Sequence, residues 1–316
     1  MITFFACPKP FLGHVGIIQR NAIQSWTLLR PKPEIILVEA DRGVAQTCKE
    51  FGLVHVAEVE RNAFGTPLVR SVFQIGQARA SHPVVCFINS DIMLMEDFVL
   101  AIETVVAHMR EFLVLGQRTD VDIKYAWDFD AADWEADLKS LLAKKGTLHP
   151  PTGIDFFCFP RGMYTDIPPF AIGRPAYDNW LVWRARSKGV PVVDVTDATL
   201  IAHQNHEPLI YNKPSLNTEN VPGGSNSERY WKALTPEARL NYTLVPEKHR
   251  LNILGATWIL DRKGRLRRRL LTLKPAYLYY HLRRMLRANC PALFNASQWV
   301  VSFAKLLLQS GRAKRG

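Results

Sequence analysis

The sequence predicts an α/β protein with a mostly parallel sheet flanked by helices. Short apolar runs that suit strands alternate with segments of helical spacing through residues 3–116. The clearest of these runs, residues 84–88, carries no charge, as expected for a strand buried on both faces. Strands and helices in this order predict parallel strands that are joined by right-handed crossovers.

Breaker residues separate the expected elements. Pro8, Pro10 and Gly13 follow the first strand, and Pro31 and Pro33 end the first helix. The expected strands span residues 3–7, 34–39, 54–59, 84–88, 112–116 and 190–195. The expected helices span residues 16–29, 44–51, 68–80, 96–112 and 177–188.

Two later regions differ from this alternating pattern. Residues 119–150 are acidic and aromatic, which favours a surface insertion or a lid. Residues 207–250 contain several Pro and Gly and are expected to be irregular. We expect a main domain at residues 1–250 and a basic, amphipathic helical C-terminal extension at residues 251–316.

The charge of the chain is concentrated at one end. The net charge is +11, and residues 262–316 contain 14 Lys or Arg and no Asp or Glu. Basic amphipathic helices with aromatic residues bind anionic membrane surfaces, which is one prediction for this segment. The alternative is that these helices pack on the body with their arginines in solvent. Nucleic acid is not favoured as a partner, because no nucleic-acid-binding motif accompanies the charge.

Cysteine usage and the first residues bear on the compartment. The five cysteines are scattered without a CxxC pair, which favours a reducing, cytosolic setting. Residues 1–6 are typical of a first strand and lack the basic start of a signal peptide. No run of 18 uninterrupted apolar residues is present, so we expect a cytoplasmic protein, peripheral on the membrane if the basic segment binds lipid.

The most informative segment is Asn89-Ser90-Asp91, directly after the uncharged strand. Open α/β sheets bind ligands at the carboxyl ends of their strands. A carboxylate there can hold a divalent cation, which usually also engages phosphates. The competing interpretation is a plain turn, since Asn, Ser and Asp all favour turns.

Three further positions are expected near the same edge of the sheet. Asp41 follows the second strand and could accept hydrogen bonds from a ribose or base, or simply form a turn. Asp178 opens a helix, where the helix dipole stabilises a negative charge, although capping alone would explain it. His203 and His206 follow another apolar run and could supply imidazole to the cation, or be packed or capping residues.

Taken together, these residues resemble the GT-A nucleotide-sugar glycosyltransferases, and most closely inverting members related to family 2. The resemblance covers about residues 1–210, including Asp41, Asn89-Ser90-Asp91 and the later histidines. The segments at residues 5–10 and 169–175 are similar to a GT-A subgroup of bacteria and plants. The resemblance implies a GT-A-like, Rossmann-like fold, and a nucleoside-diphosphate sugar donor with Mn²⁺ or Mg²⁺.

The resemblance also implies roles for individual residues. Asp91, His203 and His206 are the metal candidates, Asp178 is the candidate general base, and Asp155 is the runner-up. Arg70 and Arg118 could also bind phosphate, although exposed surface roles are the simpler interpretation. The candidates for donor binding are Cys7, Pro8, Asp41, Asn62, Arg70, Asn89, Ser90 and Asp91.

The chain departs from the family pattern at two positions. Asn89 stands where the family often has the first Asp of its DxD motif, and Tyr177 precedes Asp178 where an acidic pair is common. The expected acceptor is a glycan or a lipid-linked molecule. A sugar-nucleotide nucleotidyltransferase is an alternative, but the loop at residues 8–13 lacks the usual Gly-rich basic signature. A catalytically inactive carbohydrate-binding or scaffold protein is the third possibility, and Asn89 keeps it open.

Overall fold

The predicted α/β fold with a mostly parallel sheet is confirmed by the computed structural model, which describes residues 1–206, 231–232 and 234–269. Met1–Arg268 form one structural unit. The predicted membrane-binding segment falls almost entirely on residues 270–316, outside the described residues. Among the residues that are described, none of the helices combines the length and apolar character needed to cross a bilayer.

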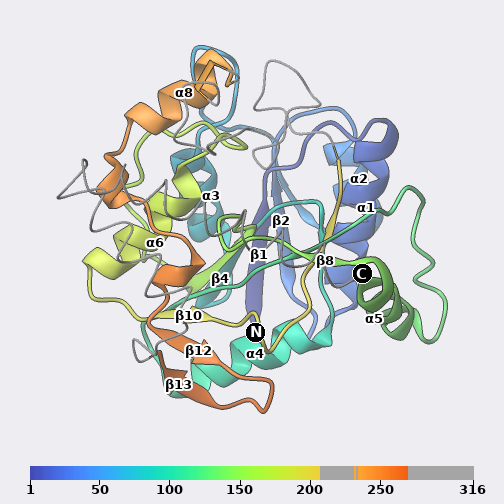
Figure 1. The fold of residues 1–316 in the computed structure, drawn as a ribbon. Helices are drawn as coiled ribbons and strands as arrows, with labels where there is room; N and C mark the ends of the chain where they lie inside the picture. The colour runs from blue at the N-terminus through green and yellow to red at the C-terminus, as the bar shows by residue number, and fades with distance from the viewer. Residues whose placement is uncertain (207–230, 233, 270–316) are drawn as a thin grey trace, which may run out of the picture. The chain divides into compact units, whose positions relative to one another are not determined.

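Most neighbouring strands of the main sheet run parallel (Figure 1). The apolar runs at residues 2–6 and 84–88 form β1 and β4, whose side chains are buried on both faces. In the described residues the sheet has nine strands, in the order β13 (Leu266–Arg268), β12 (Trp258–Leu260), β10 (Val192–Asp194), β6 (Leu113–Leu115), β9 (Phe156–Pro160), β4 (Val84–Ile88), β1 (Ile2–Ala6), β2 (Glu34–Val38) and β3 (Val54–Val56).

Two features of this sheet were not expected. Strand β9 lies between β4 and β6 and is antiparallel to both, and its residues were not among the expected strands. Strands β12 and β13 belong to the same sheet, so the first structural unit extends past the predicted boundary at residue 250. These strands were not predicted because each has only three residues, which is too short for a clear pattern in the sequence.

Helices cover both faces of the sheet, and Figure 1 shows α1 and α2 on one side of the central strands and α3 and α6 on the other. The alternation of side chains along β1 explains this arrangement: Phe4 packs in the cluster with α1 and α4, whereas Phe5 packs in the cluster with α3 and α6. The helices are α1 (Gly13–Leu28), α2 (Val44–Phe51), α3 (Val69–Arg79), α4 (Glu96–His108), α5 (Trp134–Lys145), α6 (Tyr177–Ser187) and α8 (Pro236–Thr243).

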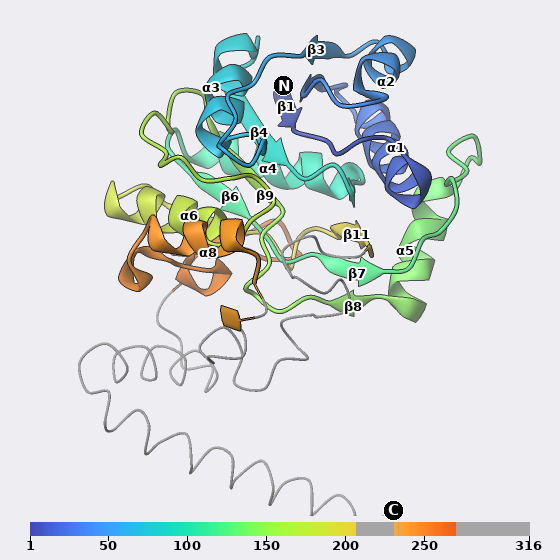
Figure 2. The same ribbon diagram turned by 90° about the horizontal axis from the view of Figure 1, so that it is seen from above.

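A second, smaller sheet is formed by segments that are distant in the sequence, and α5 lies beside it (Figure 2). Residues 119–150, which were expected to form a surface insertion or a lid, contribute two strands of this sheet and α5 with its own buried cluster. The strand order is β5 (Ile92–Met93), β11 (Ala202–Gln204), β7 (Thr119–Val121) and β8 (Thr147–Leu148). The predicted irregular region 207–250 contains α8 in its described part.

Candidate active site

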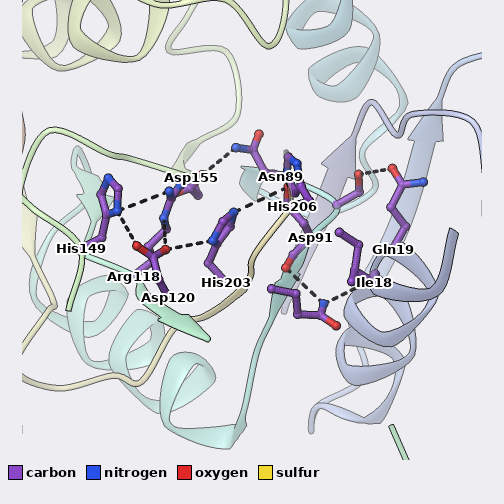
Figure 3. Close-up of polar contacts among 12 residues, drawn as sticks. Ile18, Gln19, Asn89, Asp91, Arg118, Asp120, His149, Asp155, His203 and His206 are labelled. Atoms are coloured by element: carbon purple, nitrogen blue, oxygen red, sulfur yellow. Dashed lines mark hydrogen bonds and ion pairs between the residues drawn. The ribbon is translucent and has the colours of Figure 1, made fainter. Parts of the chain in front are cut away.

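The site is centred on Asp91, which lies between the end of β4 and the short strand β5. Strand β11 pairs with β5, and this pairing brings His203 and His206 to Asp91 (Figure 3). His206 Nε2 lies 2.9 Å from Asp91 Oδ2, and His203 Nε2 lies 4.0 Å from the same oxygen. The three residues offer ligand atoms that all lie within 4.8 Å of one another. The three predicted metal ligands are thus brought together.

The chemistry of this cluster fits a divalent cation. Metal–ligand distances are about 2.0–2.2 Å, so two ligands of one cation can be separated by up to about 4.4 Å. The distances of 2.9 Å and 4.0 Å from Asp91 Oδ2 to the Nε2 atoms of His206 and His203 lie within this limit. Asp91 Oδ1 is buried and has no hydrogen-bond partner, so this oxygen is available as a ligand. Burial opposes the ionisation of Asp91, but the hydrogen bond with His206 and the charges of His203 and Lys9 outweigh it. The pKa of Asp91 therefore lies below its ordinary value, and the carboxylate is charged at neutral pH.

Buried amides hold the loops around Asp91 in place. Gln204 Nε2 donates to Ile18 O at 2.8 Å and to Asp91 O at 3.2 Å. Gln19 Oε1 accepts from the backbone N–H of Lys9 at 2.7 Å and from the Ser90 hydroxyl at 2.8 Å. Helix α1 therefore fixes the loop after β1 and the loop after β4 relative to each other, which sequence patterns did not reveal.

A second layer of charged side chains lies beside the cluster (Figure 3). Asp120 on β7 is within 2.9 Å of His203 Nδ1 and 2.6 Å of His149 Nδ1, and it accepts from Arg118 Nε at 2.8 Å. Burial raises the pKa of Asp120, but the close contacts with His149 and His203 and the Arg118 charge lower it more, so its pKa is below the ordinary value. Arg118 also donates from Nη1 to both oxygens of Asp155, each at 2.8 Å.

This layer changes two of the predicted roles. Arg118 was expected to be exposed, but its side chain is 17% exposed and joins Asp120 to Asp155. Asp155 lies at the site as predicted, but its carboxylate is bound by Arg118 and by Asn89 Nδ2 at 2.8 Å. It is therefore an ion-pair partner, whereas a general base needs an oxygen that is free to take a proton. Asn89 holds Asp155 through its amide, which an Asp in its place could not do.

Asp178 has the properties that a general base needs. It is the second residue of α6, it is half-buried, and its Oδ1 has no partner in the described part of the chain. Burial, followed by the negative charge of Asp155, raises its pKa to about 7, against the effect of backbone N–H groups of the helix start. The helix dipole was expected to favour the charge of Asp178, but burial and Asp155 outweigh it.

The segment before Asp178 is strained. Ala176 has a φ of 85°, an uncommon conformation for a residue with a Cβ, and such strain is often found at functional sites. Tyr177 is buried among the acids: after burial, the charges of Asp178, Asp155 and Asp91 raise its pKa well above the ordinary value. Asp178, the candidate base, and Asp91, the candidate cation ligand, are thus both close enough to Tyr177 to raise its pKa.

The residues predicted to bind the donor fall into two groups. Cys7, Pro8 and Asp41 follow β1 and β2 at the same edge of the sheet as Asp91. The pKa of Cys7 is raised by burial, then by the charge of nearby Glu39, and Asp41 contributes as well. Glu39 was not predicted, although it ends the second apolar run; it is 2% exposed.

Asn62 and Arg70 do not join the Asp91 cluster. Asn62 Oδ1 accepts from the backbone N–H of Thr66 at 3.0 Å, and Asn62 Nδ2 donates to Glu237 on α8 at 2.7 Å. Arg70 forms an ion pair with Glu60, and both side chains are exposed. The surface interpretation of Arg70 therefore fits the structure better than phosphate binding.

No protein-family model matches the sequence, and no curated protein matches it significantly. Solved structures that it resembles include sugar transferases. The mannosyltransferase PcManGT from Pyrobaculum calidifontis, solved with GDP-Man and Mn²⁺, is 14% identical; the alignment covers 66% of this chain and 57% of that chain, with a TM-score of 0.41. TarS from S. aureus is 10% identical, with coverages of 65% and 60% and a TM-score of 0.44.

Glucosyl-3-phosphoglycerate synthase from Mycobacterium tuberculosis, solved with Mn²⁺, UDP and glucosyl-3-phosphoglycerate, is 18% identical; the coverages are 65% and 72% and the TM-score is 0.39. The chain thus spans less than two thirds of PcManGT and of TarS. These similarities are too low to transfer residue roles from the solved structures to this chain, so the roles are argued from the geometry of its own site.

Proposed function

We propose that this protein is an inverting, divalent-metal-dependent glycosyltransferase. It would transfer a sugar from a nucleoside-diphosphate sugar to a hydroxyl group of a glycan or lipid-linked acceptor. The observation that carries the proposal is the cluster of Asp91, His203 and His206 at the carboxyl end of β4, in the same neighbourhood as Asp178 with its pKa of about 7.

The cluster supplies what the departing diphosphate requires. Two imidazoles and one carboxylate suit Mn²⁺ better than Mg²⁺, which prefers oxygen ligands alone. The bound cation would neutralise the charge that develops on the diphosphate. Lys9 adds a positive charge in the same region, since its ammonium group interacts electrostatically with Asp91.

Asp178 is the proposed general base. It takes the proton of the acceptor hydroxyl while the acceptor oxygen forms a bond to the anomeric carbon. The bond from that carbon to the diphosphate oxygen breaks in the same step, and the nucleoside diphosphate leaves. Attack from the side opposite the leaving group inverts the configuration. A base is most effective when its pKa lies near the working pH, which is the case for Asp178.

The donor nucleoside is assigned to the loops after β1 and β2. Asp41 lies there, and its carboxylate suits hydrogen bonds from a ribose or a base. Glu39 is held by an ion pair with Arg61, so it serves to stabilise this edge of the sheet.

The basic segment at residues 262–316 supports a location on the cytoplasmic face of a membrane. Its 14 basic residues without any acid would be attracted to anionic lipids, and a lipid-linked acceptor is found at such a surface. Co-sedimentation with liposomes containing anionic lipid tests this part of the proposal. Removal of residues 270–316, which contain eight of the 14 basic residues, should weaken binding strongly, and equal binding by both proteins would contradict it.

The enzymatic proposal is tested with the full chain and a panel of UDP- and GDP-sugars. Release of the nucleoside diphosphate is measured by chromatography with Mn²⁺ and with a chelator, and the anomeric configuration of the product is determined by NMR. Asp91→Asn should abolish release. Asp166→Asn, which changes an exposed acid paired with Arg184, is the matched control and should release nucleotide normally. Equal release by the Asp91 variant would contradict the proposal, and a retained configuration would contradict inversion.

A further inference from the structure

Asp120 connects the candidate cation site to Arg118 and His149. The second sheet aligns β7 and β11 in parallel, and the register places His203 opposite Asp120. The His203 side chain therefore has Asp120 on its Nδ1 side, at 2.9 Å, and Asp91 on its Nε2 side, at 4.0 Å. Figure 3 shows the imidazole between the two carboxylates.

The surroundings of Nδ1 determine which nitrogen carries the proton. His203 Nδ1 is buried from solvent, and it lacks the alignment of a full hydrogen bond although Asp120 Oδ1 is 2.9 Å away. An unprotonated Nδ1 would direct its lone pair at a carboxylate oxygen, which is repulsive. A protonated Nδ1 can align with that oxygen by a small rotation of the ring. In the neutral ring, the lone pair is then on Nε2, the nitrogen that faces Asp91.

Asp120 is itself fixed from two further directions. Arg118 Nε donates to its Oδ1 at 2.8 Å, and His149 Nδ1 lies 2.6 Å from its Oδ2. Arg118 is in turn held by Asp155, which anchors the guanidinium at a second carboxylate. Both oxygens of Asp120 therefore act as acceptors, Oδ1 for Arg118 and Oδ2 for His149, and these contacts fix the position of the carboxylate.

We propose that Asp120 is a positioning residue: it fixes His203 with Nδ1 protonated, so that the Nε2 lone pair is directed at the cation held by Asp91. The cation is part of the proposed function, and the inference rests on it. Carboxylates that orient a ligating histidine in this way typically change metal affinity by about 10–100-fold when they are removed. Asp120 was not predicted from the sequence, because its role depends on the register of two strands that are distant in the chain.

The experiment is a double-mutant cycle on Mn²⁺ affinity, measured by electron paramagnetic resonance of free Mn²⁺ with the full chain. Asp120→Ala should weaken binding about 10–100-fold, and Asp120→Asn, which keeps one acceptor oxygen, should weaken it less. In the His203→Ala background, Asp120→Ala should cause no further loss, because its effect passes through His203. Asp166→Ala is the matched control for removal of an arginine-paired acid and should bind Mn²⁺ normally.

A loss of the same size with and without His203 would overturn the inference, since Asp120 would then act by another route. Thermal unfolding of each variant identifies those that do not fold, and the Asn variant provides the test if the Ala variant fails.

Nitrogen-15 NMR of the metal-free protein, at a pH where the His203 ring is neutral, gives a second readout. His203 should be protonated on Nδ1 in the wild type and lose this preference in the Ala variant, which has no acceptor oxygen. An Nε2-protonated ring in the wild type would also overturn the inference. Absence of Mn²⁺ binding by the wild type would instead contradict the proposed function, and the NMR result would still test Asp120.

Discussion

Asp178→Asn should both abolish turnover and stabilise the protein at alkaline pH. The substitution keeps the shape of the side chain but removes its charge and its ability to accept a proton. The pKa of Asp178 is about 7 in the folded protein, whereas the ordinary value is 3.8. Loss of general-base catalysis typically costs about 10²–10⁴-fold in rate.

The expected stabilisation follows from linkage between protonation and folding. Because the pKa of Asp178 is raised on folding, Asp178 is protonated in the folded state but ionised in the unfolded state between about pH 4 and pH 7. The free energy of unfolding therefore decreases as the pH rises through this range. The rise corresponds to about 4 kcal/mol, since each pKa unit is about 1.36 kcal/mol. Because Asp178 is only half-buried, solvent screening reduces this to about 1–2 kcal/mol at pH 8.

The assay compares urea unfolding of the wild type and of Asp178→Asn at pH 5 and pH 8. The variant should be more stable than the wild type at pH 8, and the difference should shrink at pH 5. The wild-type rate of nucleotide release should rise with pH and level off above about pH 7, as Asp178 loses its proton. Asp166→Asn is the control and should bring no gain, because the pKa of Asp166 is lowered: burial raises it, but the hydrogen bond from Arg184 and the charges of Lys188 and Arg184 together outweigh burial. Unchanged turnover, or a variant no more stable than the wild type at pH 8, would refute the reasoning.

Three further predictions concern charge, packing and metal. Asp155→Asn should move the pH inflection of turnover downwards, because the charge of Asp155 helps to raise the pKa of Asp178; an unchanged profile would show that burial alone sets it. Gly76→Ala should lower the free energy of unfolding by about 1–3 kcal/mol, measured by urea denaturation, because the added Cβ would overlap the ring of Phe5; a variant as stable as the wild type would contradict this. A chelator should stop nucleotide release, and added Mn²⁺ should restore it; activity that persists in the chelator would argue against a metal-dependent reaction.

The sequence predicted the parts of the fold that depend on local patterns. Uncharged apolar runs predicted the central strands, and the polar residues after the run at 84–88 located Asp91. A later apolar run pointed to the histidines that follow it, His203 and His206. Asp178 was found because it opens a helix, although its raised pKa was not predicted. The pKa depends on burial and on Asp155, which lies far from it in the sequence.

The residues that were missed depend on long-range pairing. Asp120 and His149 belong to an acidic, aromatic region whose composition favoured an exposed lid, whereas pairing of β7 with β8 and β11 buries part of it. One sequence signal could have pointed to this part of the site. Arg118 and Asp120 are a cation and an acid two residues apart, and they follow an apolar strand. For Arg70, the local sequence could not show that Glu60 is its partner.

Anomalous diffraction from crystals of the protein grown with Mn²⁺ and UDP or GDP would locate the cation and the nucleotide. We expect one strong Mn²⁺ peak in contact with Asp91 and with His203 or His206, and a diphosphate oxygen in contact with the same ion. A peak elsewhere in the protein, or nucleotide bound far from Asp91, would contradict it.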